Sequence, residues 1–80
     1  GKWELFVDLV SQARESGQKV VVFSHYLGML DIIENYLRDS AIGYAAIRGK
    51  TVRREEELRR FATDPTCEVF VGSLQAVGLG

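Results

Sequence analysis

Apolar residues recur with a helical period in three stretches of the chain, and a short, continuous apolar run follows each stretch. In residues 2–16 one position in every three or four is apolar, which predicts an amphipathic helix. Its apolar face consists of Trp3, Phe6, Val7, Val10 and Ala13. A second helix is predicted over residues 26–39. Its apolar face consists of Tyr26, Met29, Leu30, Ile33 and Leu37.

The third periodic stretch, residues 51–64, is highly charged. Its apolar stripe is thin and consists of Val52, Leu58 and Phe61. Glu55 and Arg59 lie four positions apart in the favourable order, and the same spacing is repeated one residue later. We therefore predict a third helix with a large solvated face, which ends before Pro65.

The apolar runs at 20–23, 44–47 and 67–72 predict three strands, and glycines precede the first two. Gly17 stands where a left-handed helix end is expected, and Gly43 interrupts the second helical pattern. The run at 20–23 does not alternate with polar residues, which is typical of a strand buried on both faces of a parallel sheet. Strands that alternate with helices predict an α/β fold of the doubly wound class, with right-handed crossovers. Because three strands are few for such a sheet, we expect either a partial domain or strands supplied by a partner.

Composition narrows the class of protein. At 80 residues the chain is near the lower size limit for a stable domain, and its 46% hydrophobic content excludes a disordered protein. Its apolar runs are too short to span a membrane, and no secretion signal is visible. A single cysteine, Cys67, excludes an internal disulfide and a cysteine zinc site, and it fits an intracellular protein and a small core position.

The net charge of −1 gives no sign of nucleic-acid binding, but the distribution of charge does. Residues 48–54 carry four cations with no acid between them, and three glutamates follow directly. These cations are Arg48, Lys50, Arg53 and Arg54. They form either a local basic patch or the solvated start of a surface helix.

Candidate chemistry lies directly after the strands, where parallel sheets bind their ligands. Residues 24–26, 48–51 and 73–76 each carry a hydroxyl at this point, and the first two precede a helix. Helix N-termini suit phosphate, and Gly49 and Gly72 would let a phosphate backbone approach closely. The alternative is that Ser24 and Thr51 are N-caps. His25 is interpreted as a structural residue or a minor polar contact, because no second metal ligand accompanies it. Trp3 and Tyr44 are interpreted as packing residues.

Motifs for phosphoryl transfer are missing from the sequence. It has no Walker-type loop, no Gly-x-Gly-x-x-Gly after a strand and no pair of catalytic carboxylates, and Gly72 and Ser73 follow the third strand in place of an acidic metal ligand. We therefore expect that this chain does not hydrolyse ATP by itself.

Four segments together resemble the Swi/Snf branch of the superfamily 2 helicases. Residues 19–26 (KVVVFSHY) resemble motif IV of that family, and residues 29–37 (MLDIIENYL) resemble its next helix. Residues 47–51 (IRGKT) are similar to its Gly-x-Thr segment. Residues 71–80 (VGSLQAVGLG) look like the front of motif V, although Val77 stands where the family commonly has a second glycine. The resemblance covers essentially the whole chain in order.

The resemblance implies a three-layer, RecA-like and P-loop NTPase-like fold. Residues 1–80 would be part of the second helicase lobe, ending within motif V. The parent would be a DNA-dependent ATPase that uses ATP and Mg²⁺ through a first lobe, while this chain binds neither alone. Double-stranded DNA would be gripped by its backbone without sequence readout. The implied nucleic-acid contacts are Ser24, His25, Arg48, Gly49, Lys50, Thr51, Arg54, Ser73 and Gln75. Gly78 and Gly80 would lie near the nucleotide.

The resemblance also implies an exposed sheet edge and apolar surface, which would favour self-association. The location would be nuclear in a eukaryote and in the cytoplasm or nucleoid in a bacterium. Two other functions stay open. One is a phosphate-binding or receiver-like domain, which would need a strand-end Asp, Cys or His nucleophile. The other is a protein-interaction module that docks through its third helix and has no motor activity.

Overall fold

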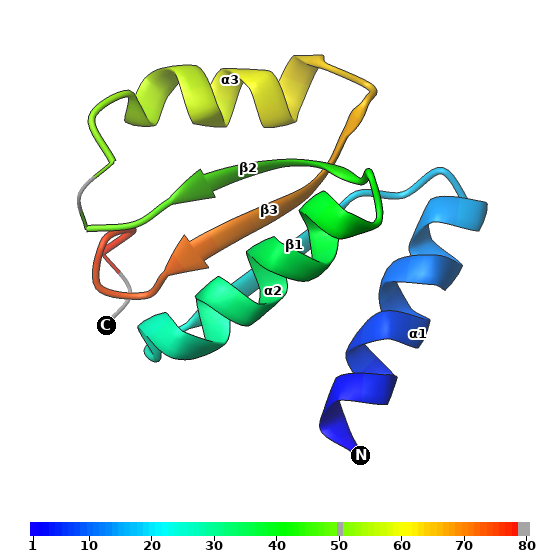
Figure 1. Ribbon diagram of the computed structural model, residues 1–80. Helices are drawn as coiled ribbons and strands as arrows, with labels where there is room; N and C mark the ends of the chain where they lie inside the picture. The colour runs from blue at the N-terminus through cyan, green and yellow to red at the C-terminus, as the bar shows by residue number, and fades with distance from the viewer. Residues whose placement is uncertain (50, 79–80) are drawn as a thin grey trace.

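The computed structural model describes residues 1–49 and 51–78, in which three helices alternate with three strands (Figure 1). The helices are α1 (Lys2–Glu15), α2 (Leu27–Asp39) and α3 (Arg54–Thr63). The strands are β1 (Val20–Ser24), β2 (Gly43–Ile47) and β3 (Cys67–Ser73). The alternation agrees with the order that the apolar pattern predicts.

All the strand pairs described are parallel, and the sheet order is β1-β3-β2, so β3 is the central strand. Its side chains point to two cores, one on each face of the sheet, and a register shift near its start puts Cys67 and Val69 on opposite faces. Val69 and Val71 face α1 and α2, whereas Cys67 and Phe70 face α3 together with Ala45 of β2. Helices therefore cover both faces of the sheet, and the α/β prediction with a three-layer arrangement is confirmed (Figure 1).

The prediction that residues 20–23 are buried on both faces is wrong. Val20 is buried, but Val21 and Phe23 are 52% and 39% exposed. The reason is the strand order, because β1 lies at the edge of the sheet while α3 packs against β2 and β3 on that face. The strand buried on both faces is β3, where Val69, Phe70 and Val71 are all nearly inaccessible.

Strand β2 forms the other edge of the sheet, and two side chains of α3 form hydrogen bonds with its backbone. Glu57 accepts a hydrogen bond from the backbone N–H of Ala46 at 3.0 Å, and Arg60 donates one to the carbonyl of Tyr44 at 2.7 Å. An edge strand whose backbone groups are satisfied is a poor template for another chain. The exposed edge expected from the sequence is therefore covered at these two residues, although apolar surface is exposed on β1.

The helix ends use a left-handed residue in two places. Gly17 has φ +69°, and Gln18 N donates to Ala13 O at 2.8 Å, which is the expected helix end. The same bond pattern ends α2, where Ile42 N donates to Leu37 O at 2.9 Å. There the left-handed residue is Ala41, with φ 56°, which no sequence signal indicated. Ala41 therefore holds a conformation that costs an L-residue free energy.

Both predicted helix starts after a strand are displaced. Helix α2 begins at Leu27, so Tyr26 is its N-cap and is 76% exposed, and Met29 is 43% exposed. The second helical face is thus narrower than predicted and consists of Leu30, Ile33 and Leu37. Helix α3 begins at Arg54 and not at Thr51, which leaves Val52 92% exposed before the helix.

Charged side chains of α3 pair three positions apart and not four. Arg53 meets Glu56 at 3.5 Å and Arg60 meets Glu57 at 3.2 Å. Glu57 also accepts a hydrogen bond from Ala46 N of β2. This contact places its carboxylate near Arg60, three residues further along the helix. The pairs are exposed at their arginines, so each contributes little to stability.

The packing roles predicted for three residues are confirmed. Trp3 stacks on the Phe6 ring with centroids 5.3 Å apart. Cys67 is 1% exposed in the α3-side core. Tyr44 is half-buried and its hydroxyl donates to Glu34 Oε1 at 2.8 Å.

Across residues 1–49 and 51–78, no helix combines the length and the apolar content that crossing a membrane requires.

Candidate functional site

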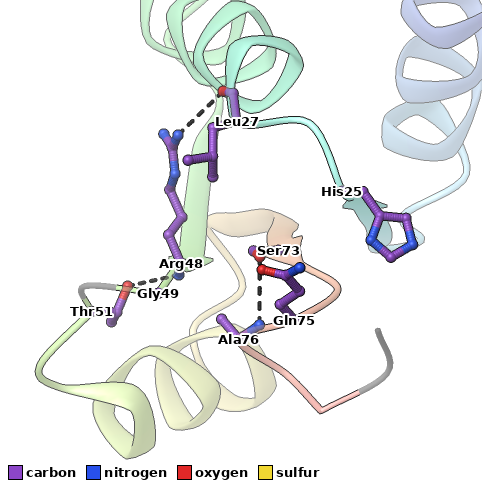
Figure 2. Close-up of a pocket in the computed structure, with 8 residues that line it drawn as sticks. All are labelled: His25, Leu27, Arg48, Gly49, Thr51, Ser73, Gln75 and Ala76. Carbon is purple, nitrogen blue, oxygen red and sulfur yellow. Dashed lines mark hydrogen bonds between the residues drawn. The ribbon is translucent and has the colours of Figure 1, made fainter.

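The turns that follow β1, β2 and β3 open at the same edge of the sheet, because parallel strands end together. Ser24 pairs with Ser73, and Ile47 pairs with Gly72, at the last position of each ladder. Between the turns lies a cavity of about 670 Å³, which we call the strand-end groove (Figure 2). It is lined by His25, Leu27, Arg48, Gly49, Thr51, Ser73, Gln75 and Ala76.

Two serines organise the turns after β1 and β3. Ser24 Oγ accepts a hydrogen bond from Tyr26 N at 3.0 Å, and Ser73 Oγ accepts one from Ala76 N at 3.4 Å. The backbone carbonyl of Ser24 also accepts from Leu74 N at 3.2 Å, which ties the two turns together. A hydroxyl can donate while it accepts, so each serine keeps a hydrogen for a ligand oxygen. Ser24 is therefore a turn residue, and the N-cap interpretation is wrong.

The turn after β2 is closed by a reciprocal pair of hydrogen bonds. Arg48 N donates to Thr51 Oγ1 at 2.8 Å, and Thr51 N donates to Arg48 O at 2.9 Å. Thr51 therefore caps this turn and not α3, which contradicts its N-cap interpretation. Gly49 is exposed, and a Cβ built at this position would meet nothing within 4 Å. An approaching ligand can therefore reach this backbone without a steric barrier.

Gly72 has a different role from the one predicted. A Cβ at this position would lie 2.8 Å from the ring of Phe23 and 3.1 Å from that of Phe70. The two rings meet edge to face across the glycine, with centroids 6.1 Å apart. Contact between these aromatic side chains, and not the approach of a phosphate, explains the glycine.

The basic run of residues 48–54 is partly neutralised in the fold. Arg48 Nη1 lies 2.7 Å from Asp31 and 3.0 Å from Glu34, both on α2. The hydrogen bond that Arg48 donates to Asp31 raises the pKa of Arg48 above its usual value. Arg53 Nη1 also lies 3.5 Å from Glu56, so of the two interpretations of this run the local basic patch is weakened at both arginines. Among the described residues, Arg54 forms no ion pair.

Most of the predicted contact residues come together. His25, Arg48, Gly49, Thr51, Ser73 and Gln75 line the groove, and His25 is exposed at the end away from Thr51 (Figure 2). Ser24 lies beside the groove, and Arg54 opens α3 without lining it. The nucleic-acid contact predicted at Lys50 and the position near the nucleotide predicted for Gly80 fall outside the described residues.

Sequence reasoning missed two lining residues, Leu27 and Ala76. Ala76 belongs to residues 73–76, which the sequence places after the third strand, but it was not named as a contact, and Leu27 lies one residue beyond the segment predicted after the first strand. The signal that could have found them is their place, three residues after a strand end, where the chain turns back over the carboxyl ends of the strands.

The turn beyond β3 is anchored by packing. Val77 packs half-buried against the α3-side core, and Gly78 follows with φ +82°. Gly78 N donates to Gln75 O at 3.2 Å, which closes the turn. A glycine in place of Val77 would remove this apolar anchor, so the side chain has a structural role here.

Among the described residues, the lining of the groove carries none of the sequence motifs that bind ATP and Mg²⁺. No Walker-type loop is present in the sequence, and the strand ends at the groove carry hydroxyls and not carboxylates. Within residues 1–49 and 51–78 no group of three or more His, Cys, Asp or Glu could hold a metal ion. The described lining offers hydroxyls, exposed backbone, one ion-paired arginine, His25 and Gln75, and such groups suit the oxygens of an anion.

Comparison with known proteins shows what this chain is similar to. No family model matches the chain. A SWI/SNF-related matrix-associated actin-dependent regulator of chromatin containing a DEAD/H box, from Xenopus tropicalis, is 38% identical over the whole chain, which covers 8% of that protein. Lymphoid-specific helicase from Homo sapiens is 30% identical over the whole chain and 10% of its own length. The homologues of this chain are SWI/SNF-related helicases. Helicase SWR1 of Eremothecium gossypii is a further member of this group, at 30% identity.

A solved structure of the same group supports the fold. The C-terminal part of the Fun30 ATPase domain superposes with a TM-score of 0.88 at 26% identity. The match covers the whole of this chain and 27% of that one, and it shows that the fold is RecA-like. The chain spans 6–10% of the length of the SWI/SNF-related relatives.

Proposed function

We propose that this chain is part of the second RecA-like lobe of an ATP-dependent double-stranded DNA translocase of the chromatin-remodelling type. Its strand-end groove grips the phosphate backbone of one DNA strand. ATP hydrolysis takes place in the complete enzyme, in which a first lobe supplies the Walker motifs. The sequence similarity to SWI/SNF-related helicases supports this proposal.

The observation that carries the proposal is the convergence of three turns on one groove. His25 lines the cavity from the end of β1, Thr51 and the exposed backbone at Gly49 from the end of β2, and Ser73 from the end of β3. Hydroxyl and backbone N–H donors suit phosphate oxygens, and they hold a strand without reading its bases. A translocase requires such contacts, because it must move along any sequence.

The groups in the groove support different tasks for the two lobes. This lobe binds DNA, and ATP-driven closure onto the first lobe shifts its grip along the duplex. Because the matched relatives come from eukaryotes such as Xenopus tropicalis and Homo sapiens, we place the protein in the nucleus and not in a bacterial nucleoid.

The proposal is tested by ATP hydrolysis of the full-length protein with and without double-stranded DNA. Strong stimulation by duplex DNA of any sequence is the expected result. Hydrolysis that is indifferent to DNA, or no hydrolysis, would leave a phosphate-binding or protein-interaction module in its place. A binding experiment with duplex DNA then locates the contact on this lobe.

Arg54 is the residue to change in that experiment, since it opens α3 and forms no ion pair among the described residues. For Arg54→Gln we expect weaker binding to every DNA sequence, and a salt dependence of log K that is flatter by about 0.9. Arg59→Gln, one turn further along the exposed helix, is the matched control and should change neither quantity. Loss confined to one DNA sequence would contradict a phosphate contact.

A further inference from the structure

We infer that Arg48 is a positioning residue of the strand-end groove, held by α2, and not one of its phosphate ligands. The inference rests on the proposed function of the groove. It also departs from the resemblance, which implies a DNA contact at this position.

The guanidinium of Arg48 points away from the turn that its backbone forms. Figure 2 shows the side chain extending toward Leu27, whose backbone carbonyl accepts a hydrogen bond from Nη2 at 3.2 Å. Nη1 is bonded to Asp31 at 2.7 Å and to Glu34 at 3.0 Å. Three acceptors of α2 thus hold one guanidinium, and its side chain is 26% exposed. To contact a phosphate it would have to leave two carboxylates behind.

Glu34 makes that departure costly. Its side chain is 12% exposed, and its other oxygen, Oε1, accepts a hydrogen bond from the Tyr44 hydroxyl at 2.8 Å. Arg38 Nη1 lies 3.7 Å from Oε1, so Arg48, at 3.0 Å from Oε2, is the nearer of its two cations. A carboxylate this poorly hydrated loses much of its stabilisation when a cation is removed. An exposed phosphate offers the arginine a single charge in a better hydrated setting. The α2 carboxylates therefore retain Arg48.

The same glutamate fastens both ends of β2 to α2. Tyr44 lies at the start of the strand and Arg48 directly follows its end, and each bonds a different oxygen of Glu34. Because Arg48 also closes the turn through Thr51, the backbone around Gly49 is fixed relative to α2. Arg48 thereby sets the wall of the groove, while hydroxyls and backbone groups of the turns face the ligand.

The test measures duplex-DNA affinity of the full-length protein by fluorescence anisotropy over a range of salt concentrations. For Arg48→Gln we expect affinity to fall at least threefold, with a salt slope equal to that of the Arg59→Gln control. A direct phosphate contact would instead flatten the slope by about 0.9, as expected for Arg54→Gln. A flatter slope, or unchanged affinity, overturns the positioning role.

Asp31→Asn gives a second test, in which Arg48 itself is not substituted. The two possible roles of Asp31 predict opposite changes in DNA affinity. If the carboxylate positions Arg48, the variant binds DNA more weakly than Asp39→Asn, which removes the same charge from the exposed end of α2. If Asp31 withholds a phosphate ligand, the released arginine tightens binding and steepens the slope, which overturns the inference. If every variant, including Arg54→Gln, has the affinity and the salt slope of the wild type, the proposed function of the groove is itself refuted.

Discussion

Replacing Gly72 by alanine tests whether packing near the carboxyl end of the central strand, β3, requires this glycine. The new Cβ would stand 2.8 Å from Cδ1 and Cε1 of Phe23, far inside the carbon–carbon separation of about 3.5–4.0 Å. It would also stand 3.1 Å from Cε1 of Phe70, which is 4% exposed and has no room to move. Phe23 is 39% exposed, so its ring is the group that yields.

The magnitude follows from two opposing contributions. Overpacking of this kind costs about 1–3 kcal/mol. Alanine restricts the unfolded chain, and this contributes about 0.4–1 kcal/mol in the other direction. The midpoints of these two ranges differ by about 1.3 kcal/mol, and we therefore expect Gly72→Ala to lower the free energy of unfolding by about 0.5–2 kcal/mol. Moving Phe23 aside also uncovers Phe70, which favours the upper part of this range.

Urea denaturation of the purified protein measures the effect, and two further variants define its cause. Gly28→Ala is the control for the change itself, because its Cβ would meet nothing within 4 Å and alanine suits a helix. Phe23→Leu should reduce the cost of Gly72→Ala, since the shorter side chain leaves space for the new methyl group. A Gly72→Ala protein as stable as the wild type would refute the packing argument. If Gly72→Ala weakens DNA binding without changing the free energy of unfolding, the glycine instead allows a phosphate to approach closely.

Two other predictions concern the helix end and the cysteine. Ala41→Gly should raise the free energy of unfolding by about 0.5–1 kcal/mol, because glycine holds the left-handed conformation at φ 56° without the cost to an L-residue; a lower urea midpoint would contradict this. Burial raises the pKa of the Cys67 thiol above 9.0, so the folded protein keeps a proton that the unfolded chain releases. Stability should therefore fall as pH rises past 9.0, and iodoacetamide should label the thiol far more slowly before unfolding than after it; equal rates would contradict the burial.

The sequence predicted those features that depend on neighbouring residues. Helical spacing gave the apolar faces around Val10 and Leu30, and the left-handed glycine at position 17 follows from its place after a helical pattern. Parallel order follows from the alternation of helices and strands, and that order alone brings all strand ends to one edge. The serine and threonine turns were therefore placed correctly before any contact was known.

Tertiary structure decided what depends on residues far apart in the chain. Strand order made β1 an edge strand, and so exposed Val21, whose neighbours in sequence are as apolar as those of a central strand. Arg48 has no acid near it in sequence, yet its partners lie 17 and 14 residues away on α2. Gly72 meets an aromatic ring from another strand. Periodicity reports which face of an element is apolar, but the neighbour on that face is set by the packing of distant segments.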